Sequence, residues 1–575
     1  MDNKVSVQQK WSNGVKMLLG GVLLFPMASY AHLIAIKATK PFPDTVTATS
    51  SATATFRVTN ITSQATVTVI DQSSFPAGSG LSITSSTCGS ALSPHQSCVI
   101  QLALEAPATP RRISTFLREW ASPTADAVQY PININVLASP TLPAISMEAV
   151  DSSALTALRD PIVAVNAGNW LILSGSLGNF HNFNNDFNPD IQVYNPVTGE
   201  MHSVLLADTN LHIRIKEQLN SASTQSLQDG DTLYIIGGFY TLLNVGWLTL
   251  DTITAINIPG MMNAVLQNDT NLAPYANVQT GIPEFRVTGG QLGKIGNDFY
   301  LAYGQNCDGA SYCTTQTYTN AIYRFVTDPT LLSTLIIGTA NSPGDDSGWR
   351  RRDYSLAPFM SGGLETLFAM AGPFTPAEDA QVWTNGIMFD GNLVANSNFI
   401  NQQANQYADA HLSMHSNSGV DYVANFSGLS NLFWATDGLK YDNTTPYGNL
   451  LSLIRSDSSG SVREYAHFKP VCSDQPLASC LYMGIGAAFI PAGNFYDSRG
   501  ILQLDQLPNA KTLVGYVYAG LVSTEQDIFA LPPPPNPPNP PSPSAASNQV
   551  YAIYVTPSQP GAMSWKDITN LYPGN

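Results

Sequence analysis

An apolar strand that ends in glycine recurs six times beyond residue 150, and this repeat limits the possible folds more than any other feature of the chain. The first copy, NWLILSG, ends at Gly175, and the second, DTLYIIGG, ends at Gly237–Gly238. The later copies end at Gly304, Gly372, Gly428 and Gly520. A loop and a partner strand follow each copy. Sheets repeated radially bury such strands without long exposed edges, so the pattern predicts a six-bladed β-propeller over residues 150–575.

The glycines also predict where each strand lies in its blade. We expect the glycine-ended segments to be the innermost strands, because strands crowd toward the axis and a glycine leaves room for that approach. The Pro-rich stretch 532–543 lies between the last such segment and its partner NQVYAIYV. We therefore interpret it as a loop inside the last blade and not as an interdomain linker.

Several stretches of the repeat region resemble secreted bacterial kelch-type propellers of the galactose-oxidase-like superfamily. The similar segments are Leu219–Tyr240, Leu248–Val265, Phe285–Gln305, Tyr318–Phe325 and Arg351–Pro358. The resemblance implies a propeller in an exported protein. It implies no particular chemistry, because function in that family is mostly unassigned.

Residues 32–140 differ from the repeat region. Short runs that alternate apolar and polar residues, such as Thr53–Thr59 and Cys98–Leu104, predict a β-sandwich. The stretch TCGSALSPHQSCVIQLALEAP resembles the immunoglobulin-like domains of bacterial surface proteins, where they act as spacers or anchors. We expect Arg111–Trp120 to form a short helical insertion and residues 141–149 to form a Pro-punctuated linker.

The first residues have the layout of a signal peptide. Lys4, Lys10 and Lys16 precede the apolar stretch Met17–Met27, and small residues favour cleavage between Ala31 and His32. Residues 1–31 are thus predicted to direct export to the periplasm, cell surface or medium. The alternative is an uncleaved membrane anchor. After removal of this segment, no apolar run is long enough to predict a membrane span.

Six cysteines fall into three couples of near neighbours. Pairing within each couple closes a turn-rich loop, which suits an oxidising compartment. The predicted disulfides join Cys88 to Cys98, Cys307 to Cys313, and Cys472 to Cys480. This pairing leaves no thiol for a cysteine–tyrosine crosslink, so the copper chemistry of the superfamily's namesake enzyme is not expected.

Charge excludes one class of partner. The formal net charge is −16, from 25 basic and 41 acidic residues, whereas nucleic-acid binding needs a cationic surface. Nucleic acid is therefore not an expected partner.

Two residue clusters are candidate sites. Arg350, Arg351, Arg352 and Asp353 could present guanidinium groups to an anionic or sugar ligand at the central channel, or the arginines could be neutralised structurally by neighbouring acids. The stretch NFNNDFNPD places oxygen ligands at alternate positions, as a Ca²⁺ loop does; these are Asn182, Asn184, Asp186 and Asp190. No other cofactor is predicted.

These patterns favour an exported, non-enzymatic binding protein that holds a protein or a glycan at one propeller face. No catalytic constellation is evident in the sequence. Two alternatives stay open at this point. One is a secreted carbohydrate-active or oxidative enzyme with its site at the propeller axis, and the other is a structural component of the cell envelope.

Overall fold

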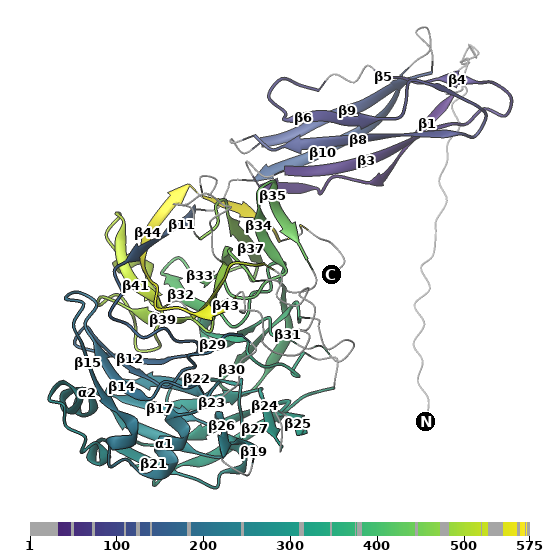
Figure 1. The fold of residues 1–575 in the computed structure, drawn as a ribbon. Coiled ribbons are helices and arrows are strands. Elements are labelled where there is room, and N and C mark those ends of the chain that lie inside the picture. Colours follow the sequence, from purple (N-terminus) through teal and green to yellow (C-terminus); the bar gives the residue numbers. More distant parts are fainter. Residues whose placement is uncertain are drawn as a thin grey trace, which may run out of the picture. The chain divides into compact units, whose positions relative to one another are not determined.

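The computed structural model of the chain is almost entirely β, as predicted (Figure 1). It describes residues 33–47, 51–71, 75–107, 111–121, 127–137, 141–180, 186–242, 246–309, 315–344, 348–373, 375, 382–442, 447–471, 482–518, 520–526, 544–560, 564–569 and 571. The chain divides into two compact units, Met1–Ala138 and Ser139–Asn575. No helix among the described residues is long and apolar enough to cross a membrane.

The first unit contains two four-stranded sheets around one core. One sheet has the order β1 (Ile34–Lys40), β3 (Ser51–Asn60), β8 (Ser97–Glu105) and β6 (Leu81–Ser86). The other has the order β2 (Thr45–Thr47), β10 (Val128–Leu137), β9 (Arg111–Trp120) and β5 (Ile70–Asp71), and a small ladder joins β4 (Val67–Thr68) to β7 (Ala91–Leu92). Every second residue of β8 is buried, as the alternation predicted.

Two features of this unit test the sequence predictions directly. The disulfide between Cys88 and Cys98 is confirmed, with the two Cα atoms 5.1 Å apart. The helical prediction for Arg111–Trp120 is wrong, because this segment is strand β9 and pairs with β10 along most of its length. Ile113 and Leu117 are buried at even spacing along β9, and that period is the one a half-buried strand requires.

Six sheets of at least four strands make up most of the described part of the second unit. Sheets 1 to 4 each contain four strands in chain order, and sheets 5 and 6 take strands from more distant segments. The strands of sheets 1 to 3 are β12 (Ile162–Asn166), β13 (Asn169–Leu173), β14 (Asp190–Tyr194) and β15 (Met201–Leu205); β16 (Gln225–Asp229), β17 (Thr232–Ile236), β20 (Ile253–Asn257) and β21 (Ala276–Gln279); and β22 (Gln291–Ile295), β23 (Asp298–Ala302), β26 (Ala321–Val326) and β27 (Leu335–Asn341).

Sheets 4 to 6 continue the series. Their strands are β28 (Ser355–Ser361), β29 (Leu364–Met370), β30 (Asn385–Asp390) and β31 (Ala395–Asn401); β40 (Leu502–Gln503), β32 (Ala410–Ser416), β33 (Val420–Phe426), β36 (Leu451–Ser456), β37 (Val462–His467) and β45 (Trp565–Asp567); and β39 (Ala488–Pro491), β41 (Thr512–Tyr518), β44 (Val550–Pro560) and β11 (Thr141–Val150).

Shorter elements fill the connections between and within the sheets. Two helices, α1 (Ile213–Leu219) and α2 (Ile258–Leu266), bury apolar residues against sheets 1 and 2. The remaining paired strands are β18 (Phe239–Leu242) with β19 (Gly246–Thr249), β24 (Gln305–Asp308) with β25 (Thr315–Tyr318), β34 (Leu432–Ala435) with β35 (Gly438–Tyr441), and β38 (Tyr482–Ile485) with β42 (Leu521–Ser523) and β43 (Ser544–Ala546).

One strand from each of the six sheets contributes to a closed ring. These strands are β12, β16, β22, β28, β32 and β39, and we call them the first strands. Each of them contacts the next from β16 round to β39, and β39 contacts β12. The last junction, between β12 and β16, is made by the Gln228 side chain. Its Nε2 donates to the Val165 carbonyl at 2.8 Å, and its Oε1 accepts from the Val165 N–H at 2.8 Å.

The glycine-ended segments are not these innermost strands. They are β13, β17, β23, β29, β33 and β41, each of which pairs directly with one strand of the ring. The predicted innermost strands are therefore wrong by one position in each sheet, because the neighbour of each glycine-ended strand lies closer to the axis. The first strands include QSLQD and AHLSMHS, whose polar residues make them poor matches to a buried-strand pattern.

Residues 141–149, which we expected to form a linker, belong instead to strand β11. This strand pairs antiparallel with β44, and its register runs from Thr141 opposite Pro560 to Val150 opposite Val550. The start of the second unit thus completes a sheet whose other strands come from its end. Strands β41 and β44, which precede and follow residues 532–543, share that sheet, as predicted. The Pro-rich stretch itself lies outside the described residues.

The terminal glycines of the glycine-ended segments confirm the predicted crowding. At Gly428, φ is +88°, and an added Cβ would lie 2.7 Å from both the Tyr407 carbonyl oxygen and the Asp409 Cβ. Real Cβ atoms do not approach other atoms so closely, so the backbone would have to shift. Gly460 also has a positive φ, +80°, but an added Cβ there would meet nothing within 4 Å.

We predict that Gly428→Ala destabilises the protein far more than Gly460→Ala does. Both substitutions place a side chain in left-handed backbone, which costs about 1–2 kcal/mol, but G428A adds a collision with the turn that leads into β32. Urea unfolding should show a loss about 1–3 kcal/mol larger for G428A. Equal losses for the two variants would contradict the crowding.

Candidate functional site

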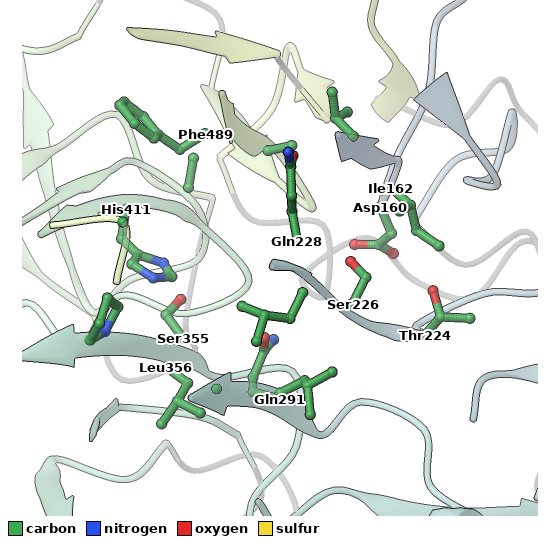
Figure 2. A pocket seen from close by; sticks show the side chains of 18 of the residues that line it. Asp160, Ile162, Thr224, Ser226, Gln228, Gln291, Ser355, Leu356, His411 and Phe489 are labelled. Carbon is green, nitrogen blue, oxygen red and sulfur yellow. The ribbon is translucent and has the colours of Figure 1, made fainter. Parts of the chain in front are cut away.

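A cavity of about 480 Å³ lies inside the ring of first strands. Residues from all six of these strands or from the turns that lead into them line it. Figure 2 shows Asp160, Thr224 and Ser226 on one side of this space and His411 and Phe489 on the other. Its volume falls within the roughly 300–1,000 Å³ of small-molecule sites. We call it the axial cavity.

One end of the axial cavity is encircled by backbone. The residue two positions before the start of each first strand has a positive φ; these six residues are Asp160, Ser223, Gly289, Asp353, Ala408 and Gly486. Five hydrogen bonds of 2.7–3.0 Å link neighbours around the axis, each from the N–H of one of these residues to the carbonyl oxygen of the preceding one in the ring. We call this arrangement the backbone ring.

The backbone ring brings two carboxyl groups to the cavity. Asp160 and Asp353 are third neighbours among its six positions, so they stand on opposite sides of the axis. Each follows an arginine: Arg159 Nε lies 3.3 Å from Asp160 Oδ2, and Arg352 Nε lies 3.6 Å from Asp353 Oδ2. Burial raises the pKa of both carboxyl groups, and repulsion from Asp353 adds to the shift of the Asp160 pKa, while the arginines oppose it.

A third carboxyl group, on Asp409, is more deeply buried. Its residue is 8% exposed, and the Ser355 hydroxyl donates to its Oδ1 at 2.5 Å. Burial raises the pKa of Asp409 to about 7. His411, two residues along, also lines the cavity, and burial lowers the pKa of its imidazole to about 4. At neutral pH the histidine is therefore uncharged, and Asp409 exchanges between two protonation states.

Uncharged hydrogen-bonding side chains line the wall next to these acids. Ser226 and Gln228 come from β16, Gln291 from β22 and Ser355 from β28 (Figure 2). Gln291 Nε2 donates to the Tyr354 carbonyl at 3.0 Å, which fixes the orientation of its amide. Apolar side chains, among them Phe489, complete the lining. The cavity thus combines fixed polar groups with aromatic rings, a lining suited to a hydroxylated ligand.

The other end of the axial cavity lies under the connection between β39 and β40. Ser498 and Arg499 of this connection line the cavity. Arg499 pairs with Asp497 and reaches Glu365 of β29, with Nη1 3.6 Å from Oε1. The segment that leaves sheet 6 is therefore held against sheet 4 at this end of the cavity.

The predicted arginine cluster is divided between different environments. Arg351 is 0% exposed, a burial that suits the structural alternative for this residue. Its guanidinium donates to the carbonyl oxygens of Gly348, Ala371 and Asn385, and burial lowers its pKa to about 10. Arg350 stacks on the Tyr318 ring at 4.2 Å. Asp353 does line the axial cavity, and Arg352 pairs with it.

The calcium prediction falls largely outside the described residues. Asn182 and Asn184 are not described, and Asp190 begins β14, where burial raises its pKa. Asp186 follows directly after the undescribed residues. Within the described ranges, no group of three or more histidine, cysteine, aspartate or glutamate side chains could hold a metal ion. A calcium site at this loop stays a prediction.

Several other predicted positions also lie outside the described residues. They include Ala31, His32, Cys313, Cys472 and Cys480. Cys307 is disulfide-bonded.

The sequence pattern does not single out Asp409 or His411. His411 and His415 lie four residues apart on β32, in different environments: His411 lines the cavity, whereas His415 Nδ1 lies 2.7 Å from Asp421 Oδ1. The local feature that marks the site is a residue with positive φ two positions before each of the six ring strands. Only two of the six residues there are glycine, so the sequence carries little sign of it.

No protein-family model matches this chain, and no curated protein matches it. Among solved structures, YjhT is 11% identical, with 61% of this chain and 91% of that chain covered and a TM-score of 0.34. A protein of unknown function from Porphyromonas gingivalis W83 is also 11% identical, with 36% of this chain and 92% of that chain covered and a TM-score of 0.15. These scores are too low to assign a fold or a function.

We predict that Arg351→Lys destabilises the fold. A lysine ammonium cannot reproduce the fan of guanidinium hydrogen bonds, so buried carbonyl oxygens would lose their donors. Chemical unfolding should show a loss of about 2–4 kcal/mol. Arg350→Lys is the matched control, and it should cost less than about 1 kcal/mol because that residue is partly exposed.

We also predict that stability falls as pH rises from about 4 to about 7. The pKa of Asp409 is raised in the folded state, so its contribution is full below about pH 4 and is lost as pH rises through about 7. Asp409→Asn should flatten the profile of unfolding free energy between about pH 4 and 7. Glu464, whose pKa burial also raises to about 7, should act the same way, so Glu464→Gln should flatten the profile further. A D409N profile parallel to that of the wild type would contradict the assignment.

Proposed function

We propose that this chain is an exported binding protein whose second unit is a six-bladed, kelch-type propeller that holds a glycan in its axial cavity. Six sheets whose first strands form a closed ring support the propeller. The two packed sheets of the first unit support an immunoglobulin-like spacer. The Cys88–Cys98 disulfide supports export, together with the predicted leader.

One observation carries the glycan assignment. The axial cavity presents hydroxyl and amide groups from neighbouring strands, and the aromatic ring of Phe489 lies on its other side. Sugars offer hydroxyl groups that pair with such side chains and C–H faces that pack on aromatic rings. A protein surface is too large to enter a space of about 480 Å³, which favours a small saccharide or the end of a glycan chain.

The buried carboxyl group of Asp409 favours a second candidate function. An acid whose pKa lies near 7 can donate or accept a proton at neutral pH, so the cavity could support acid–base chemistry on a bound sugar. Incubation with each oligosaccharide that binds, followed by product analysis by NMR, separates the two functions. Unchanged sugar supports binding alone. Turnover that Asp409→Asn abolishes would establish an enzyme.

We predict that a glycan array probed with the full chain gives specific signals, and that Ser226→Ala weakens them. Ser226 faces the cavity, so its loss removes one hydrogen bond to the ligand and should weaken binding roughly three- to tenfold by calorimetry. Ser203→Ala, at an exposed position of β15, is the matched control and should leave affinity unchanged. A blank array, or equal affinities for the two variants, would contradict glycan binding in the cavity.

A further inference from the structure

We propose that the axial cavity binds a protonated primary amine beside the backbone ring, so that its preferred ligands are amino sugars. This inference rests on the proposed glycan-binding function and names the class of sugar. The groups that carry it are the three carboxyl side chains near the backbone ring, Asp160, Asp353 and Asp409, which all line the same cavity.

The negative charges of the three carboxyl groups are balanced to different extents by nearby cations. Asp160 and Asp353 each have an arginine nitrogen within 3.6 Å. Asp409 has no ion pair among the described residues. Its Oδ2 is buried without a hydrogen-bond partner in that part of the chain, although Oδ1 accepts from Ser355. A buried acceptor left unpaired is unfavourable, so this oxygen is the position where a ligand donor gains most.

The charged and titratable groups around Asp409 leave a net negative site when it ionises. His411 lies on its own strand, and the turn before β28 brings Arg352, Asp353 and Tyr354. The turn before β12 brings Arg159 and Asp160. Strand β39 carries no titratable side chain. Asp229 and Lys294, which also line the cavity, pair with each other, and Arg499 pairs with Asp497 and Glu365. The other two arginines balance Asp160 and Asp353, and His411 is neutral at pH 7. Among the described residues of the lining, Asp409 is therefore the carboxyl group without an ion pair.

An ammonium group matches this arrangement better than a hydroxyl group does. It is a compact cation with three donors and no acceptor, so it can serve the Asp409 carboxylate and still donate to a neighbouring oxygen such as the Ser355 hydroxyl. A charge-assisted hydrogen bond is about twice as strong as a neutral one. Ser226 of β16 and Gln291 of β22 remain available to the ring hydroxyls of the same sugar, whereas the Gln228 amide is held by the Val165 backbone.

Binding of an ammonium group also changes the protonation of Asp409. The carboxyl group is partly protonated in the empty cavity at neutral pH, because burial raises its pKa to about 7. A cation beside it favours the ionised form. The carboxyl proton is therefore released to solvent when the amine binds, whereas a neutral sugar leaves it in place.

The test compares two trisaccharides on the full chain by titration calorimetry just below neutral pH. One is the trimer of glucosamine, which carries free amines, and the other is its N-acetylated form. We expect the glucosamine trimer to bind at least tenfold more tightly and to release protons, seen as a heat that depends on the ionisation enthalpy of the buffer. Both effects should disappear in Asp409→Asn.

Glu464→Gln is the matched control. Glu464 is also a buried carboxyl group with its pKa raised to about 7, but it caps the backbone N–H groups of Gln403 and Ala404 and does not line the cavity. E464Q should therefore keep the amine preference and the proton release. Proton release by the wild type is a readout that does not depend on the folding of either variant.

The outcomes separate the two proposals. If both trimers bind the wild type equally without proton release, amine recognition is overturned and glycan binding stands. If neither trimer binds while neutral glycans do, the amine inference fails in the same way. If no saccharide binds at all, the proposed function fails, and the amine inference fails with it.

Discussion

The second unit depends on the pairing of its first strand with one of its last. Strand β11 lies beside β44 in antiparallel register and completes sheet 6, and Ile145 and Val555 on these strands are buried in the same core. Sheet 6 in turn supplies β39, which contacts β32 on one side and β12 on the other. Without this pairing, the ring of first strands would open and its apolar sheet faces would meet water.

Closure of the ring strains the backbone of the residues at the axis. Six chain segments approach one another there, and their backbones turn through left-handed conformations that only two glycines among the six adopt without penalty. The hydrogen bonds between neighbouring residues of the backbone ring offset that cost. The same crowding removes water from Asp160, Asp353 and Asp409, so the geometry that closes the fold also raises the pKa values of these acids.

Much of the strand pattern could be predicted from the sequence, but the order of strands within the sheets could not. The glycine-ended segments are buried on both faces and have a strong apolar signal, as β13 and β17 illustrate. The first strands face the cavity with residues such as Gln228 and His411, and their pattern is mixed. The polar side chains that make them the candidate site are the reason that the sequence concealed them.

The sequence by itself determined the β class, the places of most strands, the glycines at crowded turns and the Cys88–Cys98 disulfide, because each depends on residues close together in the chain. Only the tertiary structure decided that residues 141–149 are a strand, that Arg351 is buried, and that Asp160, Asp353 and Asp409 share one cavity. Those outcomes depend on contacts between separate segments, some of them hundreds of residues apart as in β11 and β44. Such contacts arise from sheet register and ring closure and leave no local signal.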